Sequence, residues 1–521
     1  MYIMSMCELW QRQGFATMAT HPQATARGRL QRCMTVCLIA MTMCAGVTPI
    51  SGTAAGSEPG DDRHCAFTPA AQTERSVPGL IVSADVLLPE GHRPNHAVYI
   101  RFNGSLGAVS DFDSVRADFP HAAVLDCRGR AVLSPGFVNA HEHPAYSWAF
   151  PDPNLNPGYV HRDEWRLGLN DKMKLPSPRP HRFDPEDPRT NAVLVAMELR
   201  HLLGGATVIA GSGGVPGVIR NVNRHKREGD PALYDAEADA STFPFSFRVV
   251  EDLREECAGG ATYRFPPPAG DNLSFMAYVP HVGEGRRSSC AARAEVARYL
   301  TRVQRRDRRY SLVHGVATDR EDYALMHEFD VTLVWSPRSN LALYGETVDI
   351  AGALESGVRI ALSTDWSPSG SFNMREEVRC ARRVAEEAGV ALSGEALWRM
   401  ATVNGAYALG LEDRFGAARP GLRADLVLVK HDGRDPYDAV LEATDRDILA
   451  TWIDGRAILR SALLDDALSD GKCVTLEGVV PEVCGVLDDF GLSAGTFGDY
   501  IKDAVPLNNT SRQAPCETSR H

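Results

Sequence analysis

The stretch Ser134-Pro135-Gly136-Phe137-Val138-Asn139-Ala140-His141-Glu142-His143 places two histidines two residues apart at the end of an apolar run. In a β-strand, residues i and i+2 project from the same face, so the pattern predicts that His141 and His143 point together while Glu142 points away. Two neutral imidazoles that converge from one strand form half of a transition-metal site. The alternative is that these are two unrelated surface histidines. The rest of the chain decides between the two interpretations.

Strand-like and helix-like segments alternate downstream of this stretch. Near-continuous apolar runs, typical of strands covered on both faces, occur at residues 273–279, 311–313, 331–335 and 358–363. Apolar residues at helical spacing precede Gly204-Gly205, and a strand-like run follows at once. The alternation predicts an α/β fold with a distorted (β/α)8 TIM barrel, in which catalytic groups lie at the carboxyl ends of the strands.

Histidines and acidic residues follow these runs at the expected places. They are His281, Glu284, His314 and Asp365. With the first histidine pair they supply imidazoles and a carboxylate at successive strand ends, a set of ligands that suits Zn²⁺ or Fe²⁺. Any one of them alone would be an ordinary capping or turn residue. Their recurrence at the same point of the repeat favours a metal site.

Short β-type runs separated by turns flank the barrel region on both sides, at residues 80–133 and 424–456. The simplest architecture is a small composite β-sandwich built from both ends of the catalytic region. We therefore predict four parts: a leader at 1–75, the sandwich from 76–134 and 416–464, the barrel at 135–415, and a C-terminal extension at 465–521 without an assigned chemistry.

The first residues have the order of a secretory signal. Arg27, Arg29 and Arg32 precede a short apolar run at 33–47, and small residues follow. Such a run is too short for a stable membrane span, so we expect a secreted or periplasmic protein. Attachment of a lipid at Cys44 is a minor alternative.

Removal of the signal segment with Cys7, Cys33, Cys37 and Cys44 leaves eight cysteines, an even number that permits disulfides in an exported protein. Cys473 and Cys484 bracket a short segment rich in turn formers and are the first pair that we expect. The formal net charge of −12, without a basic stripe, argues against a nucleic-acid partner. A small molecule is the expected partner.

The ordered motifs resemble those of the amidohydrolase superfamily over about residues 79–460. The elements that carry the resemblance are His141-x-His143, His281-x-x-Glu284, His314, Pro337-x-Ser339-Asn340, Ser363-Thr364-Asp365, Ala401-Thr402-x-Asn404-Gly405-Ala406 and Pro420-Gly421-x-x-Ala424-Asp425-Leu426-Val427. The His-x-x-Glu element is similar to the aminohydrolase branch, which contains nucleobase and triazine deaminases and chlorohydrolases. Assemblies are common in this superfamily, so a homo-oligomer is a further expectation.

The resemblance implies a role for each matching residue. The implied metal ligands are His141, His143, His281 and Asp365. The resemblance also implies that Glu284 shuttles protons and that His314 lies beside the metal-bound water or the substrate. The chemistry agrees, because a divalent metal lowers the pKa of its water and a nearby carboxylate can take up and return the proton. Asp365 could equally deprotonate the water, and a neutral His314 could donate to a carbonyl or a developing oxyanion.

One absence bears on the number of metals. Two-metal members of the superfamily usually bridge their ions with a carboxylated lysine, yet the chain has no lysine between Lys226 and Lys430. We therefore favour one divalent metal ion, Zn²⁺ first and Fe²⁺ second. A glutamate could replace the bridging lysine, so two metals remain an alternative.

Five side chains are candidates for substrate binding. His161, Arg162 and Arg166 lie in a charged loop after the first metal strand and could bind a carboxylate or a phosphate. A solvated loop with an internal salt bridge is an equal alternative. Arg338 and Trp366 adjoin the last strand ends and are also expected to touch substrate.

The predicted activity is hydrolysis at a carbon that bears nitrogen. Glu284 favours deamination of a heterocyclic amine, whereas the expected export favours hydrolysis of a cyclic, linear or peptide-like amide with one or two metals. A non-catalytic barrel that only holds a ligand is a third possibility, which the complete set of expected residues argues against.

Overall fold

A computed structural model describes residues 64–71, 79–152, 155, 158–176, 181–211, 213–222, 277–303, 309–469, 471–502, 507 and 513–517. Nearly all of the predicted leader, residue Lys226 and the first part of the predicted strand at 273–279 lie outside these residues. Among the residues described, no helix combines the length and the apolar character that crossing a membrane requires.

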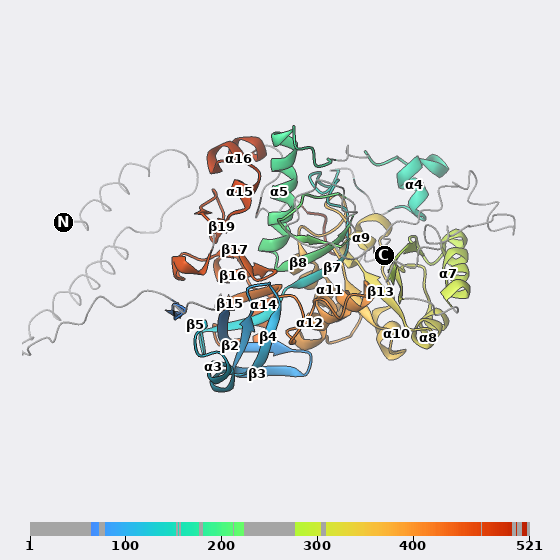
Figure 1. The fold of residues 1–521 in the computed structure, drawn as a ribbon. Helices are drawn as coiled ribbons and strands as arrows, with labels where there is room; N and C mark the ends of the chain where they lie inside the picture. Colours follow the sequence, from blue (N-terminus) through green and yellow to red (C-terminus); the bar gives the residue numbers. More distant parts are fainter. Residues whose placement is uncertain are drawn as a thin grey trace, which may run out of the picture. The chain divides into compact units, whose positions relative to one another are not determined.

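Both ends of the described chain build one large sheet (Figure 1). Its strands are β1 (Ala66–Thr68), β2 (Leu80–Leu88), β3 (Gly91–Ile100), β4 (Leu106–Asp111), β5 (Ala123–Asp126), β6 (Ala131–Pro135), β15 (Leu426–Lys430), β16 (Ile448–Ile453), β17 (Arg456–Arg460), β18 (Cys473–Val474) and β19 (Glu482–Cys484). Strand β6 pairs antiparallel with β15, so that Pro135 lies opposite Leu426. This pairing joins the two ends of the catalytic region. The sheet extends further than the predicted bounds, because β1 precedes residue 76 and β18 and β19 follow residue 464.

The central strands are parallel and form a TIM-barrel-like α/β core. They are β7 (Phe137–Glu142), β8 (Ala206–Gly211), β9 (Arg220–Asn221), β10 (Ala277–Tyr278), β11 (His281–Val282), β12 (Arg309–His314), β13 (Val331–Trp335) and β14 (Ile360–Leu362). A parallel bridge between Glu142 and Asp365 connects the end of β7 to the segment after β14. The first and last strands of this order therefore meet at the point where the sequence predicts metal ligands.

The described helices are α3 (Phe112–Asp118), α4 (Arg162–Leu167), α5 (Pro188–Leu203), α7 (Cys290–Val303), α8 (Arg320–Glu328), α9 (Pro337–Tyr344), α10 (Ile350–Glu355), α11 (Met374–Glu387), α12 (Gly394–Ala401), α13 (Val403–Ala408), α14 (Pro436–Leu441), α15 (Val486–Asp489) and α16 (Ala494–Ile501), with short 3₁₀ turns at Leu169–Asp171, Asp445–Asp447 and Asp466–Leu468. Helices such as α5, α8, α9 and α11 pack around the parallel strands, whereas α3 packs on the large sheet (Figure 1). Local signals set the bounds of α5. Asp187 accepts a hydrogen bond from the Thr190 amide, Pro188 occupies the first turn, and Gly205 adopts a φ of 85° beyond the end.

The barrel strands are buried on both faces, which explains their near-continuous apolar sequences. Every residue of β13 is buried. Val334 packs in the interior cluster with Val138, Val208 and Val313, whereas its neighbours Leu333 and Trp335 pack in the larger cluster with the helices. This alternation follows from the two-residue period of a strand, and it leaves the strand ends as the place for polar side chains.

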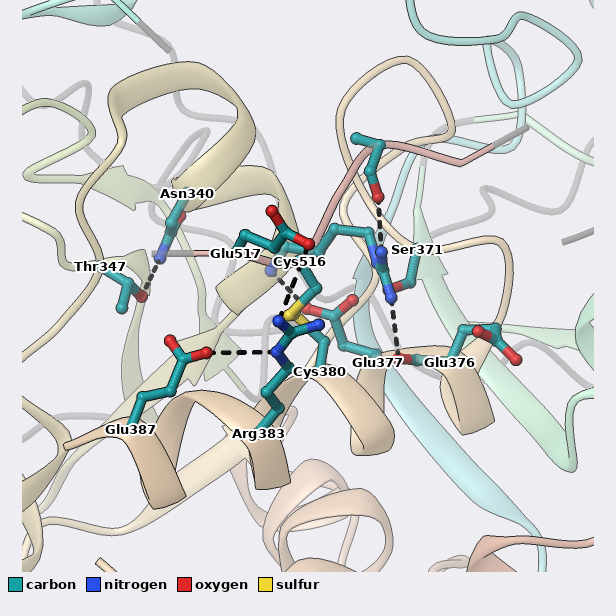
Figure 2. Close-up of a disulfide and its surroundings, with 12 residues drawn as sticks. Asn340, Thr347, Ser371, Glu376, Glu377, Cys380, Arg383, Glu387, Cys516 and Glu517 are labelled. Atoms are coloured by element: carbon teal, nitrogen blue, oxygen red, sulfur yellow. Dashed lines mark hydrogen bonds and ion pairs between the residues drawn. A yellow bond between two sulfur atoms is a disulfide. The ribbon is translucent and has the colours of Figure 1, made fainter. Parts of the chain in front are cut away.

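Three disulfides connect described cysteines. Cys65 bonds to Cys127, Cys380 to Cys516, and Cys473 to Cys484. The predicted Cys473–Cys484 pair is confirmed. Figure 2 shows that the Cys380–Cys516 bond fastens the C-terminal tail to α11. The described tail at 513–517 is therefore cross-linked to α11, which the sequence pattern alone does not reveal.

Candidate metal centre and active site

Four predicted ligands meet in one cluster. The ligating atoms of His141, His143, His281 and Asp365 all lie within 4.8 Å of one another. Nε2 of His141 is 3.1 Å from Nε2 of His143 and 3.1 Å from Oδ1 of Asp365. Ligand atoms around a tetrahedral Zn²⁺ with bonds of about 2.0–2.1 Å are separated by about 3.3 Å. The spacing and the chemical types of these atoms therefore fit one bound divalent transition metal.

Burial keeps the imidazoles in the form that binds metal. It lowers the pKa of His141 to about 4 and the pKa of His281 well below the usual value, so both rings stay neutral near pH 7. Burial alone would raise the pKa of Asp365. Hydrogen bonding with His141 and His143 overcomes that effect and holds the pKa well below its usual range. The cluster thus combines neutral imidazoles with an ionised carboxylate.

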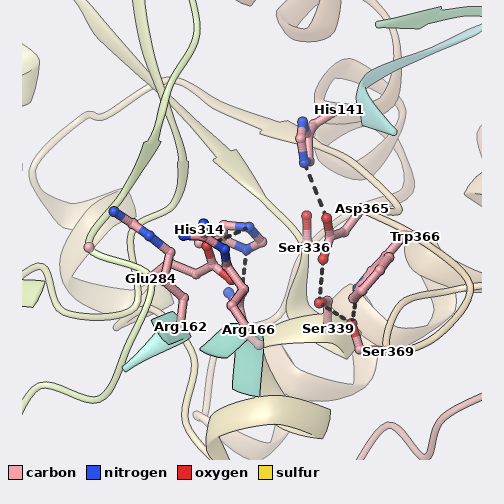
Figure 3. Close-up of polar contacts among 12 residues, drawn as sticks. His141, Arg162, Arg166, Glu284, His314, Ser336, Ser339, Asp365, Trp366 and Ser369 are labelled. Carbon is pink, nitrogen blue, oxygen red and sulfur yellow. Dashed lines mark hydrogen bonds and ion pairs between the residues drawn. The ribbon is translucent and has the colours of Figure 1, made fainter. Parts of the chain in front are cut away.

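A chain of hydroxyl groups holds the other oxygen of Asp365 (Figure 3). Oγ of Ser339 donates to Oδ2 of Asp365 at 2.6 Å and lies 2.8 Å from Oγ of Ser369. Nε1 of Trp366 donates to that Ser369 oxygen at 2.6 Å. Because an indole N–H can only donate, the chain runs from Trp366 through Ser369 and Ser339 to Asp365.

Two site residues have backbone conformations that L-residues rarely adopt. His314 has a φ of 72° and Asp365 has a φ of 65°. Left-handed backbone of this kind costs about 1–3 kcal/mol and persists where the surrounding structure enforces it. The strain occurs at the ends of β12 and β14, where it turns both side chains into the site.

Glu142 points away from the cluster, as the alternation of the strand predicts, and has its own partners. Its carboxylate accepts hydrogen bonds from the hydroxyls of Ser147 and Thr364, and it lies 3.6 Å from Nε2 of His201. Burial raises its pKa. The contact with Thr364 ties β7 to the residue before Asp365, so Glu142 links the two segments that carry three of the metal ligands.

Glu284 and His314 form the second part of the site. Oε2 of Glu284 lies 3.9 Å from Nε2 of His314, and both side chains are buried within reach of His281. Burial raises the pKa of Glu284, which suits a group that must both take up and release a proton. Nδ1 of His314 is 3.0 Å from Oδ1 of Asn340. This oxygen places a proton on Nδ1, so the neutral ring turns a lone pair toward Glu284, and donation from Nε2 requires the doubly protonated ring.

The charged loop after β7 is occupied with contacts inside the protein. His161 is buried and its ring accepts from the Asp163 amide at 3.2 Å. Arg162 forms a buried ion pair with Glu295, and Arg166 pairs with Asp163 at 2.7 Å. The arrangement matches the alternative of an internal salt bridge, and Figure 3 shows the side chains of Arg162 and Arg166 near Glu284 and His314.

The two remaining candidates behave differently. Arg338 is also engaged inside the protein, since Nε donates to Ser371 at 2.6 Å and Nη1 donates to the carbonyl of Ala514 at 2.5 Å. Trp366 borders the cluster, with its ring 5.9 Å from the ring of His143. Of the five candidates for substrate contact, Trp366 is the one that lies beside the metal ligands.

Sequence reasoning missed Tyr344, whose buried hydroxyl donates to Oε1 of Glu284 at 2.9 Å. Nε1 of Trp165 in turn donates to that hydroxyl at 2.8 Å. Helical spacing offered a signal, because Tyr344 lies four residues after Asn340 on α9 and hence on the same side of the helix. Asn340 contacts His314, so this side of α9 faces the site.

The described strands form a TIM-barrel-like core with a cluster of possible metal ligands at the strand ends. Residues 282–458 match the model of the amidohydrolase family. The predicted resemblance to the amidohydrolase superfamily is therefore confirmed, and the protein is a hydrolase that acts on carbon–nitrogen bonds.

Curated deaminases are similar to this chain in sequence, and a solved structure is similar to it in fold. The 5-methylthioadenosine/S-adenosylhomocysteine deaminase of Syntrophobacter fumaroxidans is 26% identical over 447 residues, which cover 74% of this chain and 93% of the relative. The deaminase of the same name from Pelotomaculum thermopropionicum is 26% identical over 424 residues, which cover 76% of this chain and 92% of the relative. The structure of E. coli guanine deaminase covers 74% of this chain and 99% of its own length, with 17% identity and a TM-score of 0.51. That structure supports the fold.

Proposed function

We propose that the protein hydrolyses a heterocyclic amine to the corresponding oxo compound and ammonia, with one Zn²⁺ in the site. The observation that carries the proposal is the buried carboxyl group of Glu284, which lies beside the metal ligand His281 and faces His314. Deamination needs such a group, because the proton taken from water must reach the leaving nitrogen. The curated relatives, which are named as deaminases of adenosine derivatives, support an aminopurine as the first substrate to test.

The residues of this chain have separate tasks in the reaction. His141, His143, His281 and Asp365 would hold the ion, which when bound lowers the pKa of a water molecule and so supplies the nucleophile. Glu284 takes one proton from the attacking water and returns it to the exocyclic amino nitrogen. A C–O bond forms, the C–N bond breaks, and ammonia leaves with the transferred proton. Trp366, beside His143, offers an aromatic face to a flat heterocycle.

Ammonia release from purified protein tests the proposal. The panel holds aminopurines and their nucleosides, aminopyrimidines, aminotriazines and cyclic amides. Release from an amine is expected, and turnover of amides alone would contradict deamination. Glu284→Gln should lose turnover and keep its metal, whereas Glu477→Gln, a change at an exposed glutamate, should match the wild type. Near-normal turnover by Glu284→Gln would remove its role as proton shuttle.

We also propose that the protein is exported by its N-terminal segment. The disulfides Cys65–Cys127, Cys380–Cys516 and Cys473–Cys484 support the proposal, since such bonds persist mainly in oxidising compartments. Fractionation of the source cells, followed by amino-terminal sequencing, tests it. Export predicts a mature chain that starts after the apolar run at 33–47, and a cytoplasmic protein that starts at Met1 would contradict it.

A further inference from the structure

The hydroxyl group of Tyr344 stands between an indole and the carboxyl group of Glu284. Trp165 comes from α4, in the loop that follows the first metal strand, and Tyr344 ends α9. Nε1 of Trp165 lies 2.8 Å from the phenol oxygen, and the phenol oxygen lies 2.9 Å from Oε1 of Glu284. Tyr344 and Glu284 are buried, so water does not compete freely for these hydrogen bonds.

The chemistry of the three groups fixes the direction of both hydrogen bonds. An indole N–H donates and cannot accept, whereas a phenol has one proton to donate. Since the phenol oxygen of Tyr344 accepts from Trp165, its single proton is available for Oε1 of Glu284. Oε1 is thereby kept as an acceptor. A proton that arrives at Glu284 binds Oε2, the oxygen that faces Nε2 of His314 at 3.9 Å.

The other carboxylate of the site is held in the same manner. The chain of Trp366, Ser369 and Ser339 also begins at an indole N–H and ends on one oxygen of Asp365. The rings of Trp165 and Trp366 lie 5.5 Å apart with an angle of 40° between them. Each carboxylate therefore has one oxygen held by a hydroxyl at the end of a hydrogen-bond chain that begins at an indole, and its second oxygen faces a histidine of the site.

We propose that Tyr344 and Trp165 are positioning residues that keep the mobile proton of Glu284 on Oε2, where the leaving amino group can receive it. The inference rests on the proposed deamination and adds the control of proton direction to it. A role in packing alone is the competing explanation, because Tyr344 also lies in an apolar cluster with Tyr159, Leu175, Val316 and Leu343. Tyr344→Phe separates the two, since it keeps the ring and removes only the hydroxyl.

Three variants provide a matched set for kinetics. Tyr344→Phe should lower kcat about tenfold or more and leave KM within about twofold, because proton transfer contributes about 10²–10⁴-fold to such reactions and only part of it is lost. Trp165→Phe, which frees the phenol to turn, should have a smaller effect in the same direction. Tyr159→Phe is the control, since Tyr159 shares the cluster but donates to the carbonyl of Met173 at 2.8 Å. Metal content should equal that of the wild type in all three.

Infrared spectroscopy gives a readout that does not depend on turnover. The carbonyl band of protonated Glu284 is assigned by its loss in Glu284→Gln. It should move to higher wavenumber in Tyr344→Phe, because Oε1 loses its hydrogen bond, and it should stay in place in Tyr159→Phe. An unmoved band in Tyr344→Phe, or a kcat equal to that of the control, overturns the inference. A band that moves in a protein that releases no ammonia from any amine instead contradicts the proposed function and keeps the placement of the proton.

Discussion

Nη1 of Arg162 lies 2.9 Å from Oε2 of Glu295, and both side chains are buried. The same Glu295 oxygen accepts from the backbone amide of Gly283 at 2.8 Å. Gly283 lies between His281 and Glu284 and has a φ of 64°, a conformation that favours glycine. The ion pair therefore connects α4 to α7 and holds the turn that carries the candidate metal ligand His281 and the proposed proton shuttle.

Removing one member of this pair should destabilise the protein strongly. Glu295→Gln leaves the Arg162 charge buried without its carboxylate, which typically costs about 3–5 kcal/mol of unfolding free energy. Urea unfolding followed by circular dichroism measures the loss. The exposed pair Arg383–Glu387 is the control, and Glu387→Gln should cost less than about 1 kcal/mol. Equal stability of the two variants would contradict a structural role for the buried pair.

The fold was predictable because its decisive signals are local or repeated. The buried strands β12, β13 and β14 correspond to apolar runs in the sequence. The helix α5 ends at Leu203, just before the glycine pair that predicts its end. The residue types at the strand ends then placed His141 and Asp365 on the same rim. Parallel strands in a barrel bring their carboxyl ends together, so these residues meet although they are far apart in sequence.

The rest of the site depends on contacts that sequence patterns do not encode. Whether Arg162 serves a substrate or a structural partner depends on Glu295, a residue of another helix that no spacing connects to it. The hydroxyl of Tyr344 reaches Glu284 because α9 packs against the site. From the sequence alone, a tyrosine at this position is equally consistent with a core residue. The tail at 513–517 has no periodic pattern, and its place was set by the Cys380–Cys516 bond and its hydrogen bonds.

Metal content should follow the four clustered ligands. Purified wild-type protein should hold about one metal ion per chain, and His141→Ala should hold almost none, because the three remaining ligands bind the ion more weakly. Elemental analysis after gel filtration in metal-free buffer measures both. His121→Ala, a change of an exposed side chain, should keep the wild-type content. A full equivalent of metal in His141→Ala would place the ion elsewhere, and two equivalents in the wild type would point to the group of His281, Glu284 and His314.

Stability should fall as the pH rises through the weakly acidic range because of Glu377. Burial raises the pKa of this carboxyl from 4.5 to about 7, against the attraction of Arg338 on α9 and with repulsion from Asp365 adding to the shift. Between these two values the unfolded chain has lost the proton that the folded chain keeps. The protonated Glu377 carboxyl therefore adds about 3 kcal/mol to the free energy of unfolding below pH 4.5, and this contribution is lost by about pH 7.

Glu377→Gln checks this effect, because glutamine copies the neutral acid and does not titrate. The difference in unfolding free energy between variant and wild type should grow in favour of the variant as the pH increases from 4.5 to 7. Urea unfolding at several pH values measures that difference. Glu477→Gln serves as the control and should give a difference that is constant with pH. A constant difference for Glu377→Gln would show that this carboxyl is ionised throughout the range.

The Cys380–Cys516 bond should stabilise the fold more than the Cys473–Cys484 bond does. Its cysteines are separated by 136 residues, against 11 for the second bond, and a longer closed loop removes more entropy from the unfolded chain. The loop-closure estimate is about 5 kcal/mol for the first and about 3 kcal/mol for the second. The tail adds hydrogen bonds, since Ala514 accepts from Arg338 and the side chain of Gln513 donates to Glu376 at 2.7 Å.

Paired alanine variants compare the two bonds directly. Cys380→Ala with Cys516→Ala should lose about 2 kcal/mol more unfolding free energy than Cys473→Ala with Cys484→Ala. Activity should also fall more in the first variant, because Arg338 precedes Ser339, whose hydroxyl holds Asp365. Unfolding in denaturant and metal content, measured side by side, distinguish the effects. If the two variants lose equal stability and keep full metal, the tail acts as a surface attachment and does not support the site.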